Sequence, residues 1–465
     1  MSAADRDRAA DRDRAADRDL DPGHLHLAFD LSFTHSEGRW ARPGSWVGRT
    51  FPDVRMFQEL AVTAERGGID MLFFGDGTGL PDTWRGSTDA AVEWGVQWPR
   101  HDMSPFIAAM SAVTEHVGFG LTYSSTFMHP FYVARLLNSL DHVTSGRVAF
   151  NVVASTRLAD AANYGYDQLL EHALRYERME EFIEVCQSLW DSVEPDAIVM
   201  DRETGRFADP SKVHRIDHHG RFFDVQGPLT SAPSPQGRPV LVQAGSSPQG
   251  ITTSARFADL IFGIGGNVAS QSRHRQALDA ELVANGRNPA DVGILWTTQL
   301  VIGRTEDEAR SRKQEMLEYW GDEAVGVYLS YNAGYDFSTV PERIVLGELA
   351  EEIRAAQASP AGFVGQLITE LGVDHELGRA EFFERGWRHA VGFDHTIAGT
   401  PAQIADALEE NFAATGSRGG YMIGNPLSMP ASYADVTELL VPELRRRGAM
   451  GPAYPGRTLR ENLAR

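Results

Sequence analysis

The amino-acid sequence predicts an α/β protein that folds as a (β/α)8 TIM barrel, with insertions after several of its strands. From His24 onward, apolar runs too short for helices alternate with amphipathic segments of ten or more residues, the pattern of consecutive βα units. Eight such runs occur, which is the number of strands that closes this barrel. The runs lack polar alternation, as expected for strands that are covered on both faces.

The predicted strands follow one another along the chain, with helical segments between most of them. They cover residues 24–33, 70–76, 117–125, 147–155, 239–247, 259–266, 292–303 and 419–425. The clearest helical segments are FQELAVTAERGG (57–68) and EHALRYERMEEFIEVCQSLW (171–190). Their apolar residues recur at helical spacing, so we expect such helices to form the outer layer of the barrel.

Three connections are too long to be simple loops, and we expect them to be insertions. They span residues 77–103, 191–238 and 321–399. The second contains a segment that predicts a hairpin around His219-Gly220, and the third predicts a group of helices before the last βα unit. Because barrel active sites lie at the C-terminal ends of the strands, substrate recognition is expected in such insertions.

The two ends of the chain are expected to lie outside the barrel. Residues 1–22 repeat AADRDR almost perfectly and have no apolar face, which predicts a disordered, low-complexity tail. Residues 23–450 are expected to form the barrel domain, and residues 451–465 a C-terminal tail. The single cysteine, Cys186, excludes a disulfide within the chain and a cysteine metal cluster.

The composition restricts the classes of partner. A formal net charge of −21 opposes binding to nucleic acid, whose phosphates need a basic patch. No run of about 18 apolar residues occurs, and the N-terminus lacks the apolar core of a secretory signal. We therefore expect no nucleic-acid partner, no membrane association and a cytoplasmic location.

Small polar residues stand at the ends of several predicted strands. These residues are Asp76, Thr122, Ser124, Ser155, Thr156, Ser246 and Ser247. Each alone also fits a helix cap or a turn, since Asp, Ser and Thr are favoured there. Because the ends of parallel strands meet at one rim of a barrel, together they predict a ring of polar groups at a binding site.

The segment QAGSSPQG (243–250) predicts a tight turn into a helix start, which offers free N–H groups and a positive dipole to a phosphate. The segment therefore indicates a phosphorylated cofactor. No GxGxxG opens the first βα turn and no GxxxxGK[ST] occurs, so neither a dinucleotide fold nor a P-loop is indicated. His214, His218 and His219 fit an exposed hairpin better than a metal site, and we expect no metal.

Four longer segments carry a resemblance to a known family. They are HPFYVARLLNSLDHVTSGRVAFNVVAS (129–155), HALRYERMEEFIEVCQSLW (172–190), FFDVQGPLTSAPSPQGRPVLVQAGSSPQG (222–250) and AGTPAQIADALEENF (398–412). Through them the chain resembles the luciferase-like flavin monooxygenases, in the branch of the nitrilotriacetate and dibenzothiophene-sulfone monooxygenases. The resemblance runs from about His24 to about Arg447.

The resemblance implies an enzyme that uses FMN in its reduced form, FMNH2, and O2 to oxidise a small organic substrate of xenobiotic, organosulfur or amino-polycarboxylate type. It also implies a separate NAD(P)H-dependent flavin reductase that supplies the FMNH2, and a homo-oligomer. The implied cofactor contacts are Asp76 and Thr122 near the ring system, Ser155 at the end of the fourth strand, His172 and Tyr176 facing the cofactor, and Ser246 and Ser247 at the phosphate.

The resemblance also implies that His35, just past the first strand, is the catalytic residue, close to the reactive part of the flavin. A histidine can donate a proton near neutral pH, although a loop histidine that caps a turn is the alternative. The residues after His35 depart from the Ala-Trp-Arg pattern of many relatives, which leaves the substrate open. A deazaflavin-dependent oxidoreductase and a non-catalytic flavin-binding barrel remain alternative functions, and the four segments favour FMN.

Overall fold

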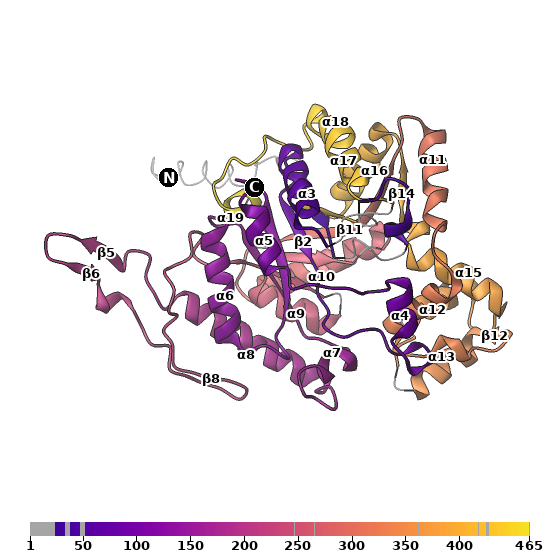
Figure 1. Ribbon diagram of the computed structural model, residues 1–465, viewed down its shortest axis with the longest axis horizontal. Helices are drawn as coiled ribbons and strands as arrows, with labels where there is room; N and C mark the ends of the chain where they lie inside the picture. Colours follow the sequence, from indigo (N-terminus) through magenta and orange to yellow (C-terminus); the bar gives the residue numbers. More distant parts are fainter. Residues whose placement is uncertain are drawn as a thin grey trace, which may run out of the picture.

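Eight parallel strands form a closed barrel (Figure 1). The computed structural model describes residues 24–32, 38–46, 52–245, 247–264, 266–356, 358–360, 362–416, 418–424 and 427–464. The barrel strands are β1 (His26–Asp30), β2 (Met71–Phe74), β3 (Gly118–Ser124), β4 (Val148–Val153), β9 (Val240–Ala244), β10 (Leu260–Gly263), β11 (Gly293–Ile302) and β15 (Gly419–Gly424). Each lies within one of the eight predicted runs, so the predicted barrel is confirmed.

The barrel closes because β1 pairs with both β2 and β15, and β11 pairs with both β10 and β15. The closing strand β15 begins with two glycines. A Cβ atom on Gly420 would lie 1.9 Å from the carbonyl oxygen of His26, and one on Gly419 would lie 2.1 Å from that of Ile294. No side chain fits at either position, so the Gly-Gly pair is what allows β15 to approach both neighbours.

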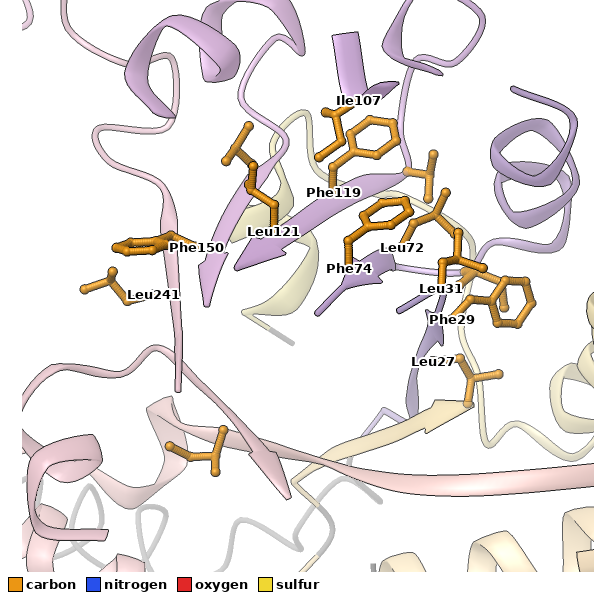
Figure 2. Packing of buried hydrophobic residues seen from close by; sticks show 14 of the residues in the cluster. Leu27, Phe29, Leu31, Leu72, Phe74, Ile107, Phe119, Leu121, Phe150 and Leu241 are labelled. Atoms are coloured by element: carbon orange, nitrogen blue, oxygen red, sulfur yellow. The ribbon is translucent and has the colours of Figure 1, made fainter. Parts of the chain in front are cut away.

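Helices cover the outside of the barrel (Figure 1). They include α3 (Val54–Gly67), α5 (Ser104–Ser111), α6 (Pro130–Val143), α8 (His172–Trp190), α9 (Pro248–Phe257), α10 (Val268–Ala284), α11 (Glu306–Gln314), α16 (Pro401–Ala414), α17 (Ala431–Asp435) and α18 (Val441–Arg447). The short helix α7 (Leu158–Ala162) follows β4 and lies beside the loop after β2. Outward-facing strand residues form the main core with them. Figure 2 shows Phe74 of β2 and Phe119 of β3 pointing toward Ile107 of α5.

A second apolar cluster lies inside the barrel, with members that alternate with the outward-facing residues along the strands. It contains Ala28, Met71, Phe73, Ala149, Val240, Val242, Leu260, Leu295, Met422 and Leu459. Leu459 comes from α19 (Leu459–Leu463), within the segment expected to be a C-terminal tail. A Cβ atom on Gly118, at the start of β3, would lie 2.6 Å from Leu459, so α19 packs against the end of the barrel where the strands begin.

The second insertion forms two hairpins. Strands β7 (His218–His219) and β8 (Asp224–Val225) form the hairpin predicted around Gly220. Strands β5 (Ile198–Asp201) and β6 (Arg206–Ala208) form a further hairpin that the sequence analysis did not predict, and it projects away from the barrel (Figure 1). Among the residues described, no helix combines the length and the apolar character needed to cross a membrane.

The first and third insertions pack on each other. The first contains α4 (Asp89–Trp94), and the third contains α12 (Asp322–Ala333), α13 (Leu346–Ala355), α14 (Phe363–Leu371) and α15 (Arg379–Ala390), besides the hairpin of β12 (Arg343–Val345) and β13 (Glu376–Gly378). The strand β14 (Ile397–Gly399), beside β11, follows them. A Cβ atom on Gly326 of α12 would lie 2.2 Å from the buried Trp84 ring, so the two insertions share one core.

Candidate functional site

Two adjoining hollows lie at the C-terminal ends of β1 to β4, and we call them together the rim pocket. The first is lined by Ser32, Phe57, Phe74, Arg100, Met103 and others, and the second by Gly77, Thr122, Ser124, Ser155, Asp160 and Tyr164, among others. Asp76 lines both. The structure therefore brings together four of the residues singled out from the sequence, Asp76, Thr122, Ser124 and Ser155.

Thr122 belongs to a chain of hydrogen bonds inside the barrel. Its hydroxyl donates to the carbonyl oxygen of Phe74 (2.9 Å), and Asn151 Nδ2 donates to Thr122 Oγ1 (2.9 Å). Asn151 is only 4% exposed, yet its Oδ1 has no hydrogen-bond partner among the residues that the structure describes. A buried amide oxygen without a partner is costly, which indicates that a donor from a ligand or a water completes it.

Sequence reasoning missed Asn151. The signal was present, since Asn151 is the one polar residue within the apolar run VAFNVV of β4. A polar side chain in the interior of a barrel strand needs a partner that only the folded structure supplies.

The ends of neighbouring strands are connected through hydroxyl groups. Ser155 Oγ donates to Ser124 Oγ over 2.8 Å, which joins the chain after β4 to the end of β3. Ser32 Oγ donates to Asp30 Oδ1 (2.5 Å) and accepts from the backbone N–H of Gly75 (2.6 Å), which joins the ends of β1 and β2. These bonds link the ends of neighbouring strands at the rim.

Two carboxyl groups at the rim have raised pKa values. Burial raises the pKa of Asp30, and the hydrogen bonds from Ser32 oppose this shift. Partial removal of water by the surrounding protein also raises the pKa of Asp76, although its side chain still contacts solvent. The hydrogen bond from the N–H of Gly77 and the positive charge of Arg100 oppose this shift. Asp76 can therefore accept hydrogen bonds at neutral pH and takes up a proton more readily than an ordinary aspartate.

The loop that carries Asp76 is held in place by α7. Asp160 Oδ1, which is buried, accepts from the backbone N–H groups of Thr78 (2.7 Å) and Gly79 (2.6 Å). Asn163 Nδ2 donates to the carbonyl oxygen of Thr78 over 2.6 Å. These contacts join the segments that follow β2 and β4, and the sequence analysis identified neither residue.

Three other predicted cofactor contacts lie at the starts of two neighbouring helices, and none of them lines the rim pocket. His172 and Tyr176 begin α8, with ring centroids 5.0 Å apart, and His172 is exposed. Ser247 is the N-cap of α9, where its hydroxyl accepts from the N–H of Gly250 over 3.1 Å. Ser247 therefore caps α9, and its binding of a phosphate stays a prediction. His35 and Ser246 lie outside the described residues.

The histidines of the second insertion do not converge. His214 Nε2 lies 2.8 Å from Glu194, His218 Nε2 lies 3.2 Å from Glu181, and His219 Nδ1 lies 2.8 Å from Asp224. Each pairs with a different carboxylate. Within the described ranges, no group of three or more His, Cys, Asp or Glu side chains is arranged to hold a metal ion.

Comparison with known proteins gives a consistent result over nearly the whole chain. Residues 29–419 match the family described as luciferase-like monooxygenase. The dibenzothiophene-sulfone monooxygenase of Rhodococcus erythropolis (strain XP) is 36% identical, over 94% of this chain and 96% of the relative. Nitrilotriacetate monooxygenase component A of Aminobacter aminovorans is 33% identical, over 95% of this chain and 96% of the relative.

Solved structures support the same assignment. The crystal structure of a long-chain alkane monooxygenase matches with a TM-score of 0.83 and 31% identity, covering 95% of each chain. A riboflavin lyase with modified FMN and riboflavin matches with a TM-score of 0.82 and 30% identity, covering 95% of this chain and 96% of the other. An F420-dependent secondary alcohol dehydrogenase is only 13% identical, with a TM-score of 0.55, and shares the fold alone.

We predict that Asp160→Ala loosens the loop that carries Asp76, because the N–H groups of Thr78 and Gly79 lose their shared acceptor. The free energy of unfolding, measured with urea, should fall by about 2 kcal/mol. Hydrogen exchange at these two amides should accelerate. Asp160→Asn retains an acceptor oxygen, so its free energy of unfolding should fall by less than half of that amount.

Asp209→Ala is the matched control, because Asp209 also accepts from a nearby N–H, that of Ser211, but lies in the exposed second insertion. It should leave exchange at residues 78 and 79 unchanged. If exchange there is also unchanged in Asp160→Ala, the loop is held by other contacts.

Proposed function

Because the chain belongs to the luciferase-like monooxygenases and is a flavin-dependent enzyme of that family, we propose that it binds reduced FMN. We further propose that it uses O2 to insert one oxygen atom into a small organic substrate, while the other oxygen atom is reduced to water with the two electrons that the reduced flavin carries. The observation that carries the proposal is the rim pocket, which presents hydroxyl groups and a carboxyl group at the ends of parallel strands. Behind its residue Thr122 lies Asn151, whose buried Oδ1 has no partner among the described residues.

The residues of the rim pocket, together with Asn151 behind Thr122, fit such a cofactor. Asn151 Oδ1 needs a donor, and Asp76 accepts hydrogen bonds, while the hydroxyls of Thr122 and Ser155 can donate or accept. A flavin ring offers N–H and carbonyl groups, and its ribityl chain offers hydroxyls. This set of neutral and acidic groups therefore suits a polar heterocycle that is held by many hydrogen bonds.

We assign the remaining contacts to the ribityl phosphate. His172 and Tyr176 at the start of α8, with Ser246 and Ser247 before α9, would hold it. The two helices are neighbours, since Thr253 of α9 donates to Glu180 of α8 over 2.8 Å. The positive end of the α9 dipole favours a phosphate at this place.

Reduced FMN, when bound, supplies the electrons for the reaction with O2. The chain's own part is to position the substrate and to keep water away from the reacting groups, which the insertions over the barrel rim allow. His35 is our candidate for moving a proton during the reaction, because it follows the first strand and a histidine side chain can give or take a proton near neutral pH.

We propose that a separate NAD(P)H-dependent reductase supplies the FMNH2. The sequence has no dinucleotide fingerprint. One relative is named as component A of its monooxygenase, which indicates a system of more than one protein. The names of the relatives include an organosulfur compound, an alkane and an amino-polycarboxylate, and we propose a small organic substrate of such a type.

We also propose that the protein is cytoplasmic and forms a homo-oligomer.

The two-component proposal predicts that the purified chain does not oxidise NADH in the presence of FMN until a flavin reductase is added. The reason is the missing dinucleotide site. The measurement is NADH absorbance with the chain alone, the reductase alone and both together. Rapid NADH oxidation by the chain alone would contradict the need for a reductase.

The phosphate assignment predicts a difference between two replacements of Ser247. Ser247→Ala removes the cap of α9 and should lower the free energy of unfolding by about 1 kcal/mol. Ser247→Asp keeps a capping oxygen but adds a negative charge. Its affinity for reduced FMN, titrated without oxygen, should fall at least about tenfold, while its affinity for reduced riboflavin, which lacks the phosphate, should be unchanged.

Thr305→Asp is the matched control, because Thr305 caps α11 in the same way, accepting from the N–H of Glu308. It should leave the affinities for both flavins unchanged. Wild-type FMN affinity in Ser247→Asp would remove Ser247 from the phosphate site.

A further inference from the structure

A group of basic and phenolic side chains stands beside the rim pocket and has no part in the proposed cofactor site. Arg100, from the first insertion, lines the first hollow. Tyr331 comes from α12 of the third insertion. Arg157 precedes α7 and follows the pocket residue Ser155 by two positions.

These three side chains lie close together. The Arg157 guanidinium carbon lies 4.1 Å from the centroid of the Tyr331 ring. A Cβ atom on Gly77 would lie 2.6 Å from Arg100 Nη1 and 3.5 Å from the Tyr331 hydroxyl. Because Gly77 lines the second hollow and Arg100 the first, the group stands where the two hollows meet.

Within the described part of the chain, the side chains of Tyr331 and Arg157 have polar groups without a protein partner. Tyr331 is only 7% exposed, yet none of these residues forms a hydrogen bond with its hydroxyl. Among the described residues, no ion pair or hydrogen bond involves the Arg157 guanidinium. The guanidinium instead lies over the ring of Tyr331. Of the nearby carboxylates, Asp160 already accepts from two N–H groups through Oδ1.

We infer that this group selects substrates that carry an oxyanion, a carboxylate or a sulfonate. A planar guanidinium presents several donors to an oxyanion, and a phenolic hydroxyl adds one more. Arg100 adds positive charge on the side of the first hollow. The inference rests on the proposed function, since an anion held here would place the rest of the substrate in the rim pocket beside the cofactor.

The position of the group favours a substrate over the cofactor phosphate as the source of the anion. The phosphate is assigned to the start of α9, whereas Arg100 and Tyr331 come from the two insertions. Insertions after barrel strands are the segments in which substrate specificity is built.

The experiment measures binding of two matched pairs of probes by calorimetry, without flavin. Phenylacetate is compared with phenylacetamide, and benzenesulfonate with benzenesulfonamide. The wild-type protein should bind at least one anion about tenfold more tightly than its amide. Arg157→Gln should reduce this preference to less than about twofold, Tyr331→Phe should reduce it severalfold, and Arg157→Lys should retain part of it.

Arg310→Gln is the control, because Arg310 lies on the exposed surface of α11. It should keep the wild-type preference. Melting temperatures identify any variant that fails to fold. If Arg157→Gln does not fold, the preference of Tyr331→Phe for the anions, the smallest change, decides the test. No preference for either anion in the wild type, or a full preference in folded Arg157→Gln, would overturn the inference.

A parallel titration with reduced FMN and reduced riboflavin separates the two proposals. Arg157→Gln should leave both affinities unchanged, and loss of the preference for FMN over riboflavin would show that this group binds the cofactor phosphate, which overturns the inference. If the wild type binds the anions but neither flavin, the proposed function fails while the oxyanion site stands. If it binds FMN but prefers no anion, only the inference fails.

Discussion

Between β1 and β15 the two backbones approach so closely that a Cβ atom on Gly420 would lie 1.9 Å from the carbonyl oxygen of His26. This contact closes the parallel sheet into a barrel and brings the C-terminal ends of all its strands to one rim. The site depends on that closure, because its polar groups come from chain segments far apart in the sequence. In an open sheet, β1 would be an edge strand and would lack one of its two neighbours.

Hydrogen bonds between strand ends then fix the shape of the rim. Ser32 connects β1 to Gly75, Thr122 connects β3 to Phe74, and Ser155 connects the segment after β4 to β3. These bonds satisfy several polar groups of the rim within the chain itself. Among the described residues, the oxygen of Asn151 and the hydroxyl of Tyr331 are buried without a partner, and the proposals for cofactor and substrate draw on them.

The sequence predicts the barrel well because its strands are buried on both faces and appear as separate apolar runs. The meeting of Asp76, Thr122 and Ser155 is predicted for a related reason, since parallel strands end at the same rim. By contrast, Asp160 and Tyr331 reach the site only through packing of α7 and α12, which no local pattern shows. The capping bond of Ser247 fits the local helix-start pattern, and that pattern alone does not distinguish a cap from a phosphate ligand.

The central claim is that this barrel binds reduced FMN and controls its reaction with O2. The most direct measurement is rapid mixing of the protein, loaded with reduced FMN without oxygen, with oxygenated buffer, while the flavin absorbance is followed. We expect the flavin in the protein to return to its oxidised spectrum in more than one resolved phase, with a time course distinct from that of free reduced FMN. A single phase with the rate of the free flavin would contradict the claim.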